Sequence, residues 1–572
     1  MLTSAALLVP LSGDPLTAAG QALAVYRAGA EVPGMPAAEP SGHCLATLSE
    51  GVLWTDVATA KVLPDEPPPS STVAAVEIAA ARGEFEPFQL ALRPTVALPA
   101  IRLECSPLSR DGRALPETAM RWNPLACYPC AQPLTVTDIV GEIPDALQPA
   151  APTDCPAGRT QSFWVTVQVP REAAPGLYEG TVRVLTADRL LGSVPLRLTV
   201  RGFTLPEERS LAAFLDPWRQ CVEKHYGKDK TAAVWPPFCE HLAEHRAAPL
   251  HPAGGGPTAA WDDQGKLTSF DGAPLDAALE AYWRDYRMPV AVLGTFTLGW
   301  GHLPRDNRFG KAADILSPLW QARCASYATA LRDHLRAKGW ADKVVFSLFD
   351  EPSPEYYPLI TGTVGLLRGI APEWRFTYWG NHAPQLDGAI RVWTIPMESY
   401  TPRLAQSLRA RGDTLWVYNP PGYRVSSSAL AARMAYWWMW REHVDAVYQW
   451  TITAWVEWTG NEHFWDPYRN ASWVVPGPEA PLDTVRFELA REGLEDYEYL
   501  VLLEKLTTQA ETRGLRDAAA AGQRLLEESR GIAWAPEDGR TAILHTRDPR
   551  LVHDLRDRLG AAITSLTAAL QP

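Results

Sequence analysis

The chain is 572 residues long and carries a formal net charge of −13 at pH 7. This length exceeds what one compact core can organise, so we expect two or three domains. The acidic balance, without any cluster of Lys and Arg, argues against a nucleic-acid partner. No uncharged apolar run reaches about 18 residues, so we predict no membrane span.

Aromatic residues are the unusual part of the composition, with 23 Trp, 18 Tyr and 14 Phe. Flat aromatic faces suit sugar rings, which offer axial C–H bonds and a mixed polar and apolar surface. Large protein cores also bury Trp, so composition leaves both interpretations open.

Eight cysteines are scattered along the chain, which is not the pattern of a small disulfide framework. A Cys127–Cys130 or Cys130–Cys155 disulfide stays open for an exported protein. No side-chain set has metal-ligand spacing, so we predict neither a metal nor an organic cofactor. No positive residue precedes Arg27, so a secretory signal is not recognised. We expect a cytoplasmic protein if the sequence is complete and a secreted one otherwise; the oligomeric state is not predicted.

In chain order, residues 1–45 stay unassigned except for a short helix over 16–26. Residues 46–205 contain short β-type runs separated by Pro and Gly, which predicts a β-sandwich domain. The clearest runs are 88–92, 101–105, 163–169, 178–184 and 194–200.

Residues 206–480 repeat a strand, loop and helix rhythm, which predicts a (β/α)8 TIM barrel. The expected strands are 212–215, 248–251, 290–296, 344–349, 376–379, 391–395, 415–418 and 446–450. The expected helices are 316–338, 356–369, 404–411 and 429–442. An open doubly wound sheet is the alternative, but no Gly-rich phosphate loop follows the first strand.

Residues 481–572 are predicted to form helices packed on the barrel, over 485–506, 516–528 and 550–570. Ala490, Leu494, Tyr497 and Val501 recur at helical spacing in the first of these. The aromatic run 436–440 lies within an expected helix, so we assign it to the core or to an interface. The predicted fold class is therefore a multidomain α/β and β protein.

The fourth expected barrel strand ends in Asp350 and Glu351, and Pro352 then stops it because proline has no N–H to donate. Catalytic groups of such barrels lie at the carboxyl ends of the strands. Neighbouring residues of a regular strand point to opposite faces, so both acids reach one pocket only where the chain leaves the strand.

Two carboxylates so close together should separate their pKa values, one group staying ionised and the other holding a proton near neutral pH. Cleavage of a glycosidic bond needs such a pair. The structural alternative is that Asp350 caps the next helix and Glu351 is a solvated rim residue.

Other strand ends add aromatic platforms beside amides, imidazoles and acids, which suits stacking and hydroxyl recognition. Each residue alone is equally compatible with ordinary packing. The candidate substrate-binding residues are Asp216, Trp300, His302, Tyr378, Trp379, Asn381, Tyr418, Asn419, Trp450, Trp455 and Glu457.

Three further motifs accompany the Asp350-Glu351-Pro352 strand end: Ala81 to Gln89, Pro175 to Gly180 and Arg491 to Tyr499. Together they resemble the glycoside hydrolase family 123 and DUF4091 proteins over residues 46–506. The resemblance implies an N-terminal β-sandwich, a catalytic (β/α)8 barrel and β-N-acetylgalactosaminidase activity on a carbohydrate substrate.

The resemblance also implies substrate-assisted catalysis with retention, in which the 2-acetamido oxygen of the sugar is the nucleophile. Asp350 would orient the acetamido group, and Glu351 would act as general acid and then as general base. Tyr378 corresponds by strand order to a family tyrosine that hydrogen-bonds the acetamido oxygen. We expect Arg491 and Asp496 to make structural polar contacts instead.

Two rival interpretations stay open. In a two-carboxylate retaining glycosidase, Glu351 would be the acid and Glu398 or Glu457 the nucleophile. In a non-catalytic carbohydrate-binding protein, the aromatic residues alone would carry the function.

Overall fold

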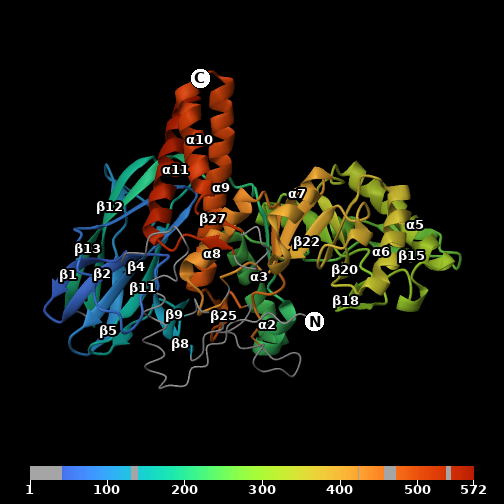
Figure 1. Ribbon diagram of the computed structural model, residues 1–572. Helices are drawn as coiled ribbons and strands as arrows, with labels where there is room; N and C mark the ends of the chain where they lie inside the picture. Colours follow the sequence, from blue (N-terminus) through green and yellow to red (C-terminus); the bar gives the residue numbers. More distant parts are fainter. Residues whose placement is uncertain are drawn as a thin grey trace, which may run out of the picture.

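The computed structural model describes residues 41–130, 139–187, 189–422, 424–455, 472–535 and 543–571. Figure 1 shows β-sheets of the N-terminal part on one side and a parallel sheet with its helices on the other. Long C-terminal helices stand between them.

Two sheets make up the N-terminal part. One has the order β1 (His43–Leu48), β2 (Gly51–Val57), β4 (Phe85–Pro94), β11 (Gln161–Gln168), β8 (Met120–Cys130) and β9 (Gly141–Leu147). The other has the order β10 (Thr153–Cys155), β5 (Leu98–Cys105), β12 (Gly176–Thr186), β13 (Arg189–Thr204) and β3 (Val76–Arg82), with β6 (Ser109–Arg110) and β7 (Arg113–Ala114) at its side.

The two N-terminal sheets share one buried apolar cluster. Leu90 and Val165 enter it from the first sheet, and Leu103, Val184 and Leu196 enter it from the second. Strand β13 alternates buried and exposed residues over much of its length, as a strand with one face on a core must. The expected strand-rich N-terminal part is confirmed.

The middle of the chain forms a curled parallel sheet. Its order is β17, β20, β21, β22, β23, β24 and β14, so the first strand of the region pairs with the last. The bounds are β14 (Ala212–Leu215), β17 (Ala291–Leu293), β20 (Val344–Asp350), β21 (Arg375–Trp379), β22 (Val392–Pro396), β23 (Thr414–Tyr418) and β24 (Ala446–Gln449), with β18 (Gly299–Trp300) and β19 (Leu303–Pro304) at one edge.

The strand expected over 248–251 is wrong. Ala248 makes only an isolated parallel bridge to Phe214, and no ladder joins these described residues to β17. Pro249 and Pro252 lack the N–H groups that a ladder needs.

Helices follow most of the parallel strands. Those expected over 316–338, 356–369, 404–411 and 429–442 are present as α5 (Pro318–Ala337), α6 (Tyr357–Ile370), α7 (Pro402–Ala410) and α8 (Ala429–Arg441). The elements that were not predicted are α2 (Arg219–Tyr226), α3 (Lys228–Glu244), α4 (Ala273–Tyr286) and the hairpin of β15 (Thr258–Trp261) and β16 (Leu267–Asp271). Helix α3 contains Pro236 and Pro237, which hide a helix from propensity arguments.

The C-terminal part contains α9 (Val485–Thr512), α10 (Arg516–Arg530) and α11 (Pro549–Ala569), close to the predicted bounds, with the short strands β25 (Val475–Pro476), β26 (Pro481–Leu482), β27 (Ala533–Trp534) and β28 (Leu544–His545). Helix α9 joins the two sheet regions: Glu488 accepts a 2.9 Å hydrogen bond from Trp164 Nε1 of β11, while α9 packs on α8. Gly493 permits that packing, because a Cβ there would lie 2.4 Å from Tyr436 Cδ2.

Buried ion pairs surround α9. Asp496 accepts a 2.6 Å hydrogen bond from Arg433 Nε, and Arg491 Nη2 lies 2.6 Å from Glu488. The expected structural role of Arg491 and Asp496 is confirmed. The aromatic run 436–440 is buried in α8, as expected.

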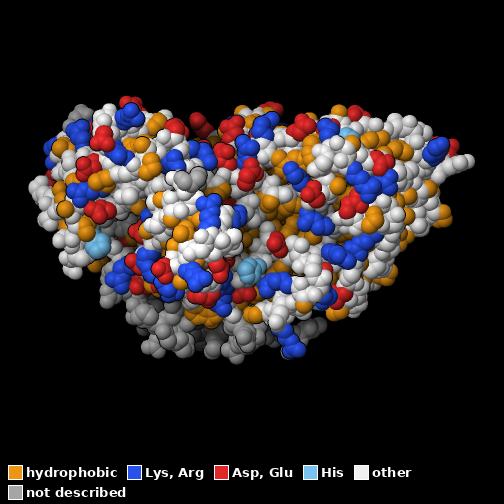
Figure 2. Space-filling model, turned by 90° about the horizontal axis from the view of Figure 1, so that it is seen from above, with side chains coloured by type: hydrophobic (Ala, Val, Ile, Leu, Met, Phe, Trp, Pro, Cys, Tyr) orange, Lys and Arg blue, Asp and Glu red, His pale blue; other side chains and the backbone are white. Residues whose placement is uncertain are grey.

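None of the eight cysteines, all of which lie in the described ranges, is disulfide-bonded. Among the helices of the described residues, none is both long and apolar enough to cross a membrane. Figure 2 shows basic and acidic side chains interspersed over the face that it displays.

Candidate active site

The acid pair lies where β20 leaves its sheet. The pairing of β20 with β21 shifts register between Ser347 and Asp350. Glu351 N–H then donates to the carbonyl oxygen of Trp379 at 2.9 Å, and Glu351 has a φ of 44°. This left-handed backbone is uncommon for a residue with a side chain, and such conformations concentrate at functional sites.

The Glu351 side chain is hydrogen-bonded at one oxygen and lies near an imidazole at the other. Tyr418 Oη donates to Oε1 at 2.9 Å, while His302 Nε2 lies 3.5 Å from Oε2. Burial and the negative charge of Glu351 raise the pKa of Tyr418, so its phenol remains a donor. The Glu351 side chain is nevertheless 47% exposed, which leaves it accessible to a ligand.

Asp350 is more enclosed. Burial, and then the charge of Glu351, raise its pKa to about 6, against a smaller opposing effect from His302 and the Gly301 N–H. The pKa of Asp350 is therefore raised, as expected for one member of the acid pair, and its causes are burial and the charge of Glu351. This carboxyl changes its charge near neutral pH.

A third acid, Asp216, directly follows β14, the first strand of the parallel sheet. Burial raises the pKa of Asp216 to about 7, although the Leu250 N–H stabilises its ionised form. Burial, and then the charges of Asp216 and Asp350, raise the pKa of Tyr448, a residue of β24 whose ring lies 5.7 Å from that of Trp379. Tyr448 was not among the predicted site residues; its place on the last expected strand, two residues before Trp450, was the available signal.

Four of the other predicted site residues lie at the carboxyl ends of the parallel strands with side chains that a ligand can reach or that contact Glu351. His302 and Tyr418 contact Glu351, and Trp300 is exposed beside Arg305. Asn419 follows β23 with a φ of 58° and keeps a buried Oδ1 without a protein hydrogen-bond partner among the described residues. Such an unsatisfied acceptor suits a ligand donor.

Tyr378 is placed differently from its expected role. Its hydroxyl donates to the carbonyl oxygen of Asn381, and its ring packs on Trp393. Neighbouring strand residues face opposite ways, and Trp379 meets Tyr448, so Tyr378 lies on the other face of β21. The Asn381 side chain accepts from Ser399.

The last strand end contributes packing as well. Trp450 meets Trp218 edge-on at 5.5 Å, and Trp455 donates to Val474 O at 2.8 Å. Glu457 lies outside the described residues.

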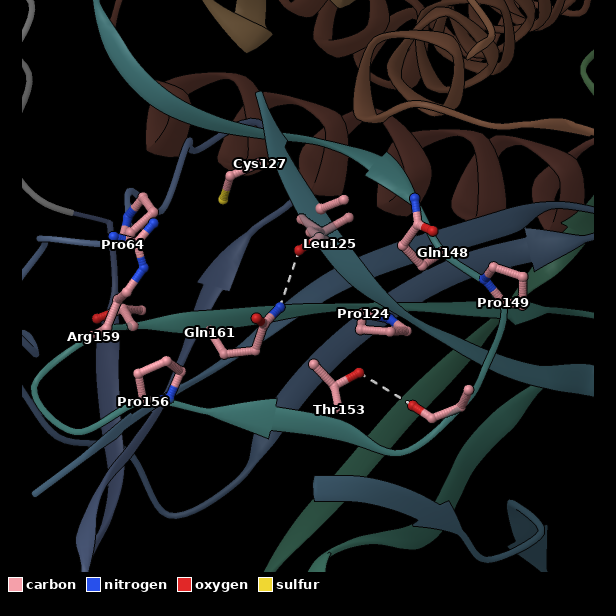
Figure 3. A pocket seen from close by; sticks show the side chains of 13 residues that line it. Pro64, Pro124, Leu125, Cys127, Gln148, Pro149, Thr153, Pro156, Arg159 and Gln161 are labelled. Atoms are coloured by element: carbon pink, nitrogen blue, oxygen red, sulfur yellow. Dashed lines mark hydrogen bonds between the residues drawn. The ribbon is translucent and has the colours of Figure 1, made fainter. Parts of the chain in front are cut away.

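A cavity of about 500 Å³ lies elsewhere, in the N-terminal part (Figure 3). Its lining includes Cys127 and Arg159 but no carboxyl side chain. Gln161 donates from its side chain to Leu125 O at 3.0 Å. The cavity therefore lacks the acid pair that glycoside hydrolysis needs.

Two family models match the sequence. The catalytic-domain model of glycoside hydrolase 123 matches residues 305–503, and the N-terminal-domain model of glycoside hydrolase 123 matches residues 66–186. Together they span more than half of the chain, and the catalytic model includes the acid pair. No curated protein matches the sequence.

Solved structures agree at the level of the fold. A family 123 glycoside hydrolase from Clostridium perfringens, studied for glycolipid glycan hydrolysis, has a TM-score of 0.62 at 13% identity and covers 91% of this chain and 98% of its own.

Two other enzymes are more distant. A family 39 glycoside hydrolase from Bacteroides cellulosilyticus has a TM-score of 0.32 at 11% identity, covering 76% of this chain and 82% of its own. A Bacteroides ovatus GH5 xyloglucanase has a TM-score of 0.29 at 10% identity, covering 73% and 98%. From its two domain models and its fold, this chain belongs to glycoside hydrolase family 123 and is a glycoside hydrolase.

Proposed function

We propose that this enzyme removes β-linked N-acetylhexosamine, of the GalNAc type, by substrate-assisted catalysis with retention. Asp350 would accept the acetamido N–H and hold the acetamido oxygen against the anomeric carbon. Glu351 would protonate the leaving oxygen and then take a proton from the attacking water.

The observation that carries this proposal is the identity of the residues opposite Glu351. Strand β23 ends at Tyr418 and is followed by Asn419, and Tyr418 donates to Glu351 instead of facing it as a second carboxylate. The charge of Glu351 helps to raise the pKa of Asp350, as expected for two acids beside one pocket. Asp350, next to the general acid, can orient an acetamido group, and the substrate then supplies the nucleophile.

The surroundings of Glu351 support its role as acid and base. One oxygen is oriented by Tyr418, and the exposed remainder of the carboxyl can reach a bound glycoside. A hydrogen bond from a neutral phenol fixes the rotamer without neutralising the group.

For the domain architecture, we propose a β-sandwich over 46–205, a (β/α)8 barrel over 206–480 and a helical segment over 481–572. The shared apolar cluster of the N-terminal sheets supports the first, and the pairing of β14 with β24 supports the second.

A panel of aryl β-glycosides, with and without a 2-acetamido group, tests the proposal. We expect turnover of GalNAc or GlcNAc glycosides only, with kcat lowered at least about 100-fold in Glu351→Gln. Glu355→Gln is the control, because this exposed acid lies just beyond the pair. Full activity of Asp350→Asn would refute substrate assistance. Glycolipid glycans, named for the Clostridium perfringens structure, are the natural substrates to test first.

Glu398 offers the competing nucleophile, because its charge acts on Tyr418. It lies in a short turn after β22 and is exposed. Hydrolysis of glycosides without an acetamido group, lost in Glu398→Gln, would establish the two-carboxylate mechanism instead.

A further inference from the structure

Two imidazoles and a carboxylate meet at the junction of α3 and α9. His241 lies in the last turn of α3, His245 caps that helix, and Asp483 precedes α9. One ligand atom from each of the three lies within 4.8 Å of the other two, and this is the only such group of metal-ligating side chains among the described residues. It is separate from Asp350 and Glu351.

Both imidazoles direct the same ring nitrogen toward the carboxylate. His241 Nε2 lies 2.6 Å from Asp483 Oδ2, and His245 Nε2 lies 3.9 Å from the same oxygen. Helical spacing of four residues brings the two rings to one face, with centroids 4.4 Å apart.

The opposite ring nitrogens have acceptors of their own. His245 Nδ1 lies 3.0 Å from the carbonyl oxygen of His241, and His241 Nδ1 lies 3.5 Å from Glu244 Oε2. Metal-binding histidines typically donate their second N–H to a carbonyl or carboxylate in this way, which leaves the Nε2 lone pair for the ion. In the metal-free protein His241 Nε2–H donates to Asp483, so a bound ion would take the place of that proton.

The neighbouring acid is already occupied. Glu488 lies 3.2 Å from His245 Nε2, but it accepts from Arg491 at 2.6 and 3.0 Å and also from Trp164 and Thr166. Glu488 therefore adds negative charge beside His241, His245 and Asp483, but its oxygens are already used by these hydrogen bonds. The ring of Phe487 stacks on His245 at 4.0 Å and closes one side.

We propose that His241, His245 and Asp483 bind one divalent transition-metal ion, with zinc as the fitting class. Two imidazoles and one carboxylate are ligands that zinc accepts, with water as the fourth. The His241 side chain is 28% exposed, whereas that of His245 is fully buried, so the ion enters beside His241.

The site is structural because of where it lies. Helix α3 leads to Ala248, which makes an isolated parallel bridge to Phe214 of β14, so His245 is at the amino edge of the parallel sheet. Asp350 and Glu351 lie at its carboxyl edge, where the strands end. The ion would fasten α3 to the start of α9. The sequence did not indicate this site because Asp483 lies 242 residues beyond His241, and only the H-x-x-x-H spacing of the two histidines is local.

Zinc titration of the chelator-treated full chain, followed by calorimetry, tests the site. We expect one zinc ion per chain, with affinity reduced at least about 10- to 100-fold in His241→Gln and in Asp483→Asn. Bound Co2+ should give the visible absorption of a low-coordinate nitrogen and oxygen site, and His241→Gln should abolish it. Zinc should also raise the melting temperature of the unsubstituted protein.

The control is His334→Gln. His334 and Asp276 form a comparable pair, with Nε2 2.6 Å from Oδ1 and similar exposure, but without a second imidazole. This variant should bind zinc like the unsubstituted chain. Absence of stoichiometric binding, or equal binding by His241→Gln, Asp483→Asn and His334→Gln, would overturn the proposal and leave His241 and Asp483 as a simple ion pair. Circular dichroism verifies that each variant is folded.

Discussion

Replacing Asp350 by Asn should stabilise the protein while impairing its chemistry. Burial and Glu351 raise the pKa of Asp350 from its ordinary value of 3.8 to about 6. At about 1.4 kcal/mol for each pKa unit, the ionised form is destabilised in the folded state by up to about 3 kcal/mol. Because the folded pKa is the higher one, the penalty is absent below the unfolded pKa and complete above about pH 6. Asn has the same shape and no charge, so it avoids this penalty.

Equilibrium denaturation of Asp350→Asn and of the unsubstituted protein measures the effect. We expect a gain in unfolding free energy of up to about 3 kcal/mol at pH 8 and about half as much at pH 5. Glu355→Gln, which removes an exposed charge, should change stability by less than about 0.5 kcal/mol. If Asp350→Asn is no more stable than the unsubstituted protein at pH 8, burial of an ionised Asp350 is not a source of strain. The same variant should lower kcat about 100-fold on N-acetylhexosamine glycosides.

Tyr418→Phe removes the 2.9 Å hydrogen bond to Glu351, so kcat/KM should fall about 10- to 100-fold in steady-state kinetics. An unchanged near-ultraviolet circular dichroism spectrum would show that the loss of activity is not caused by misfolding. Gly493→Ala places a Cβ 2.4 Å from the Tyr436 ring and should lower the unfolding free energy by about 1 to 3 kcal/mol. A melting temperature equal to that of the unsubstituted protein would contradict the tight contact of α8 and α9. Arg433→Met removes the buried guanidinium that pairs with Glu492 and Asp496, of which only Asp496 keeps a second ion pair among the described residues, with Arg556. We expect a cost of about 3 to 5 kcal/mol in chemical denaturation, whereas a neutral result would show that the surrounding charges rearrange.

Much of the fold was predictable from local pattern. Helices α5 to α11 appear near their predicted bounds because their apolar spacing and flanking breakers are contained within each segment. Helix α3 was missed because Pro236 and Pro237 contradict helix propensity, and tertiary packing overrides them. The strand over 248–251 was wrong because Pro249 within it and Pro252 directly after it have no N–H for a strand ladder.

The candidate active site was likewise predictable only in part. The sequence placed Asp350 and Glu351 at a strand end, because strand direction and proline chemistry are local properties. It could not show which way Tyr378 faces, since the parity of a strand depends on the register of its neighbours. Nor could it bring His302 and Tyr418 to Glu351.

By itself, therefore, the sequence determined the order of elements, the position of the acid pair and the family to which the motifs point. Only the tertiary structure decided which side chains surround those acids, how far burial raises the pKa of Asp350 and Asp216, and that His241 meets Asp483. The reason is physical: secondary structure follows from neighbours along the chain, whereas hydrogen-bond partners, burial and charge environment depend on residues that only folding brings together.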